Sequence, residues 1–190
     1  MKYSIALVLC ALPSAAAELE LRYTALERIL AGQLFTQEGR HYVRGNRTTK
    51  CQFAYLETPH IDSDAGRLRI AARFSGRSAL DLFGGCVGLG DSFDLTITAT
   101  PTPRNNTIAL NEVRVTAAKD SYYIRRVQAA MTQSIARDFK IELRDQARRL
   151  LEQTHEGAPY QQELAAFTLN EIKITPESLI LVLDFRLVVK

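Results

Sequence analysis

The sequence is poor in the residues that bind transition metals. It contains three histidines and three cysteines among 190 residues, and no two cysteines form a C-x-x-C pair. The histidines, His41, His60 and His155, are far apart along the chain. Because zinc sites use clustered cysteine and histidine ligands at short spacings, the sequence predicts no metal site, and we expect no cofactor.

Long apolar runs and a strong charge imbalance are also missing. No run approaches the roughly 18 to 20 apolar residues that are needed to span a bilayer. The net charge is only +3, and the arginines are spread along the chain. Proteins that bind nucleic acid carry a clustered basic face, so we expect no nucleic-acid partner. The content of 46% hydrophobic and 24% charged residues is that of a globular protein with a real core.

Residues 1–17 have the pattern of a secretory signal peptide. A lysine near the start precedes a short apolar run, and Ala15-Ala16-Ala17 supplies the small residues of a cleavage site. The alternative is a buried first helix, but Pro13 argues against it because proline breaks helix interiors. We therefore expect cleavage before Glu18 and a periplasmic or secreted protein in which residues 18–190 form a single domain.

The cysteines allow two interpretations. Export would remove Cys10 and leave Cys51 and Cys86, and a pair of cysteines in an oxidising compartment is most simply a disulfide. Alternatively, Gly84, Cys86 and Gly88 match a G-x-C-x-G nucleophile elbow. No apolar strand leads tightly into these glycines, as an elbow requires, and no histidine lies in a catalytic motif. We expect the Cys51–Cys86 disulfide and a protein that is not an enzyme.

Apolar periodicity indicates a helix followed by a β-meander. Steps of three and four over residues 18–34 predict an amphipathic helix. Alternation with a period of two then predicts four antiparallel strands joined in sequence, over residues 51–58, 67–74, 93–100 and 108–117. A change of phase at Asn111-Glu112 predicts a β-bulge in the last of them.

A long amphipathic pattern follows the strands. Apolar residues recur at steps of three or four from Ile124 to Leu150, which predicts one helix that begins at Asp120 or Ser121 and ends near Gly157. Two closing apolar runs predict a β-hairpin that turns at residues 175–178. The fold class is therefore α+β: an N-terminal helix, a curved meander, one long helix and a C-terminal hairpin.

In this order of elements the chain resembles the TULIP (tubular lipid-binding) superfamily, in particular its BPI-like half-domains and the small YceB-like periplasmic lipoproteins. The stretches IALNEVRV (108–115) and FTLNEIKITPESLILVLDF (167–185) carry the resemblance. Leu9 before Cys10 departs from the lipobox of those lipoproteins. The resemblance implies a curved antiparallel sheet wrapped around the long helix, with an apolar groove between them that holds acyl chains.

Two functional hypotheses follow. The first is a non-enzymatic, secreted binder of a lipid acyl chain or another long apolar ligand. The residues expected to line its groove are Val127, Met131, Ile135, Phe139, Leu143, Leu181, Leu183 and Phe185. The alternative is a structural or partner-binding envelope protein with a closed core and no ligand, whose outer arginines meet an envelope protein or an acidic membrane surface.

Overall fold

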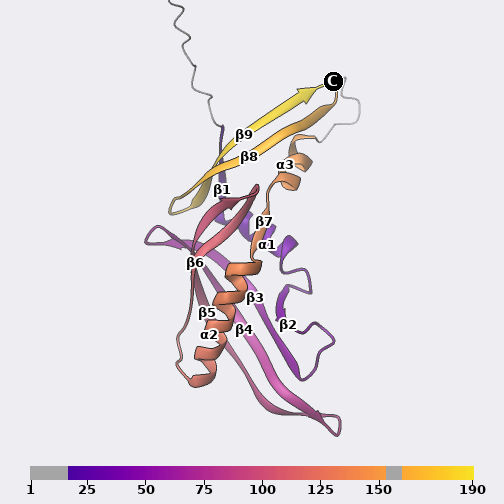
Figure 1. The fold of residues 1–190 in the computed structure, drawn as a ribbon, viewed down its shortest axis with the longest axis vertical. Helices are drawn as coiled ribbons and strands as arrows, with labels where there is room; N and C mark the ends of the chain where they lie inside the picture. The colour runs from indigo at the N-terminus through magenta and orange to yellow at the C-terminus, as the bar shows by residue number, and fades with distance from the viewer. Residues whose placement is uncertain (1–16, 153–159) are drawn as a thin grey trace, which may run out of the picture.

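The structure is a computed structural model that describes residues 17–152 and 160–190, and it is mostly β (Figure 1). Strands hold 60% and helices 21% of the described residues. In chain order the elements are β1 (Ala17–Arg22), α1 (Tyr23–Gln33), β2 (Arg40–Arg44), β3 (Gln52–Asp64), β4 (Arg67–Leu82), β5 (Gly85–Arg104), β6 (Thr107–Ala117), α2 (Tyr122–Asp138), β7 (Lys140–Glu142), α3 (Arg144–Leu151), β8 (Gln162–Ile174) and β9 (Ser178–Val189).

The strands form two antiparallel sheets. A curled six-stranded sheet has the order β2-β3-β4-β5-β6-β7, and a three-stranded sheet has the order β1-β9-β8. The predicted four-strand meander is confirmed as β3 to β6, although its strands are longer than expected. The predicted bulge is also confirmed, because the register between β5 and β6 shifts opposite Asn111 and Glu112.

The predicted α+β class, with one long helix wrapped by the meander, is wrong, because the structure is mostly β and holds only three short helices among the described residues. The helix α2 ends at Asp138, residues 140–142 form β7 beside β6, and only then does the short helix α3 begin. The stretch Phe139-Lys140-Ile141-Glu142-Leu143 also alternates with a period of two, and Ile141 and Leu143 are buried. The free edge of β6 supplies hydrogen-bond partners to this stretch, which favours a strand over a continued helix. The predicted helix end near Gly157 lies outside the described residues.

The N-terminal prediction is only half right. Residues 23–33 are helical, but residues 17–22 form β1, which pairs with β9 from Ala17–Leu183 to Arg22–Ser178. The C-terminal hairpin of β8 and β9 is confirmed, with its turn at residues 175–177. The predicted signal peptide lies in residues 1–17, of which the structure describes only Ala17.

One hydrophobic cluster joins the two sheets. The even-numbered side of β4 from Leu68 to Phe74 is buried, and so is the facing side of β5. The helix α2 packs on this surface with Ile124, Met131 and Ile135, and α1 adds Leu26 and Leu30. Leu179 and Leu181 of β9 belong to the same cluster.

The hairpin of β4 and β5 extends beyond this core to one end of the molecule (Figure 1). The pairing between β3 and β4 ends at Gln52 and Ser78, whereas β4 and β5 stay paired to Leu82 and Gly85. A disulfide between Cys51 and Cys86, with the Cα atoms 5.3 Å apart, ties the hairpin to the chain just before β3. The predicted disulfide is thus present. Within the described residues, none of the three helices combines the length and hydropathy that crossing a bilayer requires.

Candidate functional site

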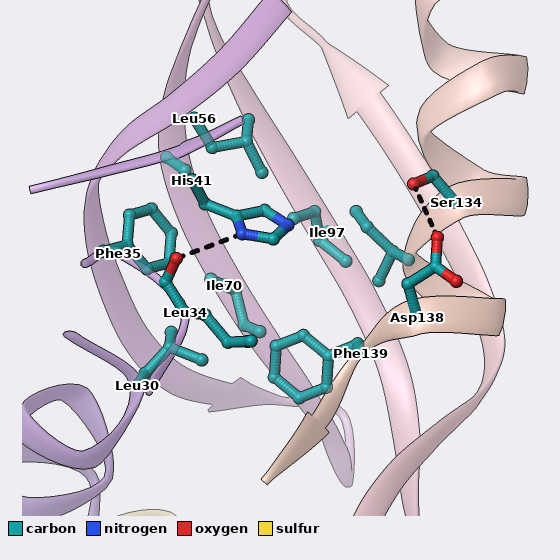
Figure 2. A pocket seen from close by; sticks show the side chains of 12 residues that line it. Leu30, Leu34, Phe35, His41, Leu56, Ile70, Ile97, Ser134, Asp138 and Phe139 are labelled. Carbon is teal, nitrogen blue, oxygen red and sulfur yellow. Dashed lines mark hydrogen bonds between the residues drawn. The ribbon is translucent and has the colours of Figure 1, made fainter. Parts of the chain in front are cut away.

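Two hollows lie between α2 and the curled sheet, and they share Ser134. The first is a closed crevice beside the C-terminal half of α2 (Figure 2). Its volume is about 30 Å³, room for a water molecule or two. Leu30, Leu34 and Phe35 approach it from α1 and the residues after it, and Ile135 and Phe139 approach it from α2. An apolar space of this size has no room for an acyl chain.

The crevice also holds a histidine, a serine and an aspartate, but they do not form a catalytic triad. In a triad the histidine accepts the serine proton and the carboxylate orients the histidine. Here Ser134 Oγ donates to Asp138 Oδ2 at 3.3 Å, and His41 Nδ1 donates to the Leu34 carbonyl at 3.1 Å (Figure 2). Hydrogen bonds from the Arg137 guanidinium lower the pKa of the Asp138 carboxyl, and Ser134 and His41 contribute in the same direction.

The second hollow is an open cleft of about 520 Å³ beside the N-terminal half of α2. This volume lies within the range of roughly 300 to 1,000 Å³ that is typical of small-molecule sites. Three strands and the helix supply its apolar lining: Val43, Phe53, Ala54, Phe74, Val127, Ala130 and Met131. The space between α2 and the sheet is therefore closed at one end and open at the other.

Arginines stand on opposite walls of the cleft. Arg44 comes from β2 and Arg126 from α2, and no aspartate or glutamate lines the cleft with them. Arg44 donates to the side-chain oxygen of Gln52 at 2.8 Å, and neither arginine has an ion-pair partner among the described residues. Arg77 also lines the cleft, although its Nε lies beside Gly90 on the neighbouring strand.

The arginines on the outer face of β4 differ from those of the cleft. Arg67 pairs with Glu112, Arg69 with Asp62, and Arg73 with Asp94. A paired guanidinium on a solvated face is the ordinary arrangement. The arginines of the cleft, unlike those on the outer face of β4, are not neutralised by a carboxylate. The cleft is therefore both electropositive and lined by apolar side chains.

Tyr123 lies at the hairpin end of the cleft. Burial raises the pKa of its phenol, and the nearby Asp91 carboxylate raises it further. The tyrosine is therefore neutral at physiological pH and can donate a hydrogen bond to an anion. Within the described residues, no three His, Cys, Asp or Glu side chains are grouped so as to hold a metal ion.

The residues that the sequence predicted for one groove lie in several places. Val127 and Met131 line the open cleft, whereas Ile135 and Phe139 line the closed crevice. The other four are elsewhere in the fold, where neither hollow includes them: Leu143, Leu181 and Leu183 are buried in the core, and Phe185 is 45% exposed on β9. A single groove along the whole stripe is thus not what the fold forms, because the stripe is divided between α2, β7 and α3.

The sequence reasoning missed Arg44, Arg126 and the wall that β2 contributes. Arg126 belongs to a polar helix face that is rich in arginine, and nothing in its spacing separates it from Arg125, which pairs with Asp120. Arg44 lies in a turn-rich stretch between two glycine-containing segments. Only the pairing of β2 with β3 brings these two arginines to one cleft.

The chain has no recognised relative in the comparisons with known proteins. No family model, no curated protein and no solved structure matches it. The resemblance to the tubular lipid-binding superfamily is therefore supported by none of them and stays a prediction from the sequence.

Proposed function

We propose that the protein is a non-enzymatic binder of an amphiphile that has one apolar chain and an anionic head. The observation that carries the proposal is the open cleft, whose apolar lining is combined with three arginines that have no ion-pair partner among the described residues, Arg44, Arg77 and Arg126, and with no carboxylate. An apolar chain would lie against Phe74, Val127 and Met131. Each methylene removed from water there contributes about 0.8 kcal/mol.

The head group would lie at the cleft mouth, between Arg44 and Arg126. A guanidinium presents several N–H donors in a rigid fork that suits carboxylate and phosphate oxygens. Two such forks in one cleft would attract an anion, whereas a neutral head group would leave Arg126 without a charged partner. The proposal therefore specifies a fatty acid or an acyl phosphate rather than an uncharged lipid.

The proposal places this activity outside the cytoplasm, after removal of residues 1–17. The Cys51–Cys86 disulfide is compatible with export, because disulfides persist in oxidising compartments. Cleavage before Glu18 would leave residues 18–22 of β1 paired with β9, and the ion pair between Glu18 and Lys173 would remain. The mass of the protein recovered from culture medium or periplasm tests the cleavage position directly.

The binding test uses a fluorescent fatty acid and its methyl ester, which differ only in the head charge. We expect uptake of the acid, and several-fold weaker uptake after Arg126→Gln, with the difference shrinking at high salt because mobile ions screen exposed charges. Arg125→Gln is the matched control, because Arg125 is the next residue on α2 but pairs with Asp120 outside the cleft.

A second pair of variants tests the apolar part of the site. Ala130→Trp places an indole in the cleft and should abolish uptake of the acid and the ester alike. Ala129→Trp, one residue earlier and outside the lining, should leave uptake unchanged. Failure of the unmodified protein to take up either probe would contradict the proposal, and so would equal losses in the two tryptophan variants.

A further inference from the structure

The free end of the β4–β5 hairpin is unusually apolar for a surface. Half of the large hydrophobic side chains that are exposed in the described residues belong to residues 80–89, at the end of this hairpin: Leu80, Leu82, Phe83, Val87 and Leu89. Residues 78–90 contain a single charged residue, Asp81. Contiguous exposed apolar patches of this kind mark surfaces that bind another phase or molecule.

Strand pairing places most of these side chains on one face. Leu80 lies opposite Val87, and Ser78 lies opposite Leu89, on the same side of the strands as the buried Phe74 and Phe93. Asp81 lies opposite Cys86 on the other side, where it can stay in water. The hairpin therefore has an apolar face that continues the core side of the sheet beyond anything that covers it.

Phe83 at the turn is the least expected residue. It has a φ of 53°, Gly84 has a φ of 83°, and together they join Leu82 to Gly85 in a two-residue turn. Turns with two positive φ angles favour asparagine or glycine, and a bulky residue there is strained. The Phe83 side chain is fully exposed, so no contact within the described fold offsets the strain. A strained residue that the fold does not use points to a function.

Three cations lie near the base of the hairpin, where Asp91, opposite Gly76, supplies one carboxylate. Lys50 precedes the disulfide-bonded Cys51, Arg77 lies beside Gly90 on the neighbouring strand, and Arg126 lines the adjoining cleft. None of the three has an ion-pair partner among residues 17–152 and 160–190. Basic residues next to an apolar anchor are the arrangement that binds the surface of an anionic bilayer.

From these observations we infer that the hairpin tip docks the protein on an anionic lipid surface. Leu80 and Leu82 lie two and four residues beyond Ser78, the last residue of β4 that pairs with β3, which places them about 7 and 13 Å beyond that pairing at about 3.3 Å per strand residue. This reach is enough for the tip to enter a bilayer by the roughly 5 to 10 Å that is usual for interfacial anchors. Deeper insertion is disfavoured, because the hairpin edges carry unpaired backbone N–H and C=O groups that hydrocarbon cannot satisfy.

Docking in this way would hold the mouth of the cleft near the bilayer, because Arg77 and Ser78 belong to both the hairpin base and the cleft lining. The docking inference does not depend on the proposed ligand. Vesicle binding and uptake of a fatty acid are measured separately, so either can fail while the other holds.

The absence of tryptophan from the chain makes a direct test possible. In Phe83→Trp the single indole reports the environment of the tip, and in Phe185→Trp it reports β9 on the other sheet. With vesicles of phosphatidylcholine and phosphatidylglycerol, we expect a blue shift and quenching by lipid-attached quenchers for Phe83→Trp alone. Vesicles of phosphatidylcholine only should give a weaker response. An unchanged Phe83→Trp spectrum with both kinds of vesicle would overturn the inference.

Vesicle flotation of a second variant separates docking from folding. Phe83→Asn suits the turn better than phenylalanine does, so the fold should be at least as stable, yet binding to the anionic vesicles should weaken by about tenfold or more. Val189→Asn, which removes an exposed apolar side chain near the other end of the molecule, should bind like the unmodified protein. Equal losses in both variants, or a concentration-dependent dimer that Phe83→Asn abolishes without any vesicle binding, would contradict a lipid partner.

Discussion

The two halves of β4 present the same kind of surface to very different surroundings. Leu68, in the first half, is 1% exposed, whereas Leu80, in the second half, is 64% exposed. Both belong to the even-numbered side of one strand, and both lie opposite apolar or small residues of β5. The even-numbered side of the first half is covered by α1, α2 and the C-terminal hairpin, and this cover reaches Gly76, whereas Leu80 and Leu82 beyond it are covered by nothing in the described fold. The alternation of apolar residues shows which side of a strand is apolar. It does not show how much of that side other helices and strands will pack against.

Between the two halves lies Gly76, which marks the end of the core. A Cβ at this position would lie 2.6 Å from Cζ of Phe74 and 3.3 Å from the hydroxyl of Tyr123. The ring of Phe74 thus folds over the glycine and closes the core at this end. The open cleft begins at the same ring, since Phe74 also belongs to its lining.

The largest expected difference between the halves is in stability. Leu68→Ala should lower the free energy of unfolding by about 2 to 5 kcal/mol, because it leaves a cavity in a packed region. Leu80→Ala should change it by no more than about 0.5 kcal/mol, as exposed substitutions usually do. Urea denaturation of both variants measures the difference, and similar losses would mean that the hairpin is covered in solution.

The disulfide ties the bare half to the covered half, and its loss should be the next largest effect. Cys51 and Cys86 are separated by 35 residues, and in the loop-entropy model such a bridge contributes about 3 to 4 kcal/mol. Replacing both cysteines by alanine should therefore lower the free energy of unfolding by about that amount. Reduction of the unmodified protein is the control. A double variant as stable as the oxidised protein would show that the hairpin pairing alone holds this region.

Bulky substitutions along α2 compare its closed and open ends. Ile135→Trp should cost about 1 to 3 kcal/mol of stability, because the crevice of about 30 Å³ cannot take the added volume. Ala130→Trp should cost much less, because it fills an open cleft. Thermal denaturation of the two variants measures the difference between these stability costs. If Ile135→Trp were tolerated as well as Ala130→Trp, the crevice would be open in solution.

The outer face of the covered half should show the smallest effect. Hydrogen bonds from the Arg69 guanidinium, with Arg69 Nε 2.6 Å from Asp62 Oδ1, lower the pKa of the Asp62 carboxyl. A lowered folded-state pKa contributes stability above the unfolded-state pKa, and this stability is lost as the pH falls through the folded-state value. Asp62→Asn should therefore be slightly less stable than the unmodified protein at neutral pH.

The pH and salt dependence of that small difference is its signature. The two proteins should converge in acid below the folded-state pKa of Asp62 and also at high salt, because the pair is partly exposed and screened. Denaturation midpoints from acid to neutral pH measure it. A difference that persists in acid would assign the effect to packing rather than to charge.

Much of the fold could be predicted from the periodicity of the chain. The meander, the bulge near Glu112 and the C-terminal hairpin all have local patterns that no competing structure matches. The long helix was wrong because residues 139–143 satisfy two patterns at once. Phe139 and Leu143 are four apart, as on a helix, and Phe139, Ile141 and Leu143 alternate, as on a strand. The available edge of β6 decides between them, and that edge is distant in the sequence.

The sequence by itself determined the local facts: which residues alternate, where the chain turns, and, through the predicted signal peptide, which two cysteines were expected to pair. Only the tertiary structure decided what these surfaces meet. It placed Arg44 and Arg126 on one cleft and divided the apolar residues of α2 between the closed crevice and the open cleft. It also left the hairpin tip around Phe83 uncovered. The physical reason is that periodicity comes from the backbone of each residue and its near neighbours. Whether an apolar surface becomes buried, in contrast, depends on elements that are brought together from distant parts of the chain.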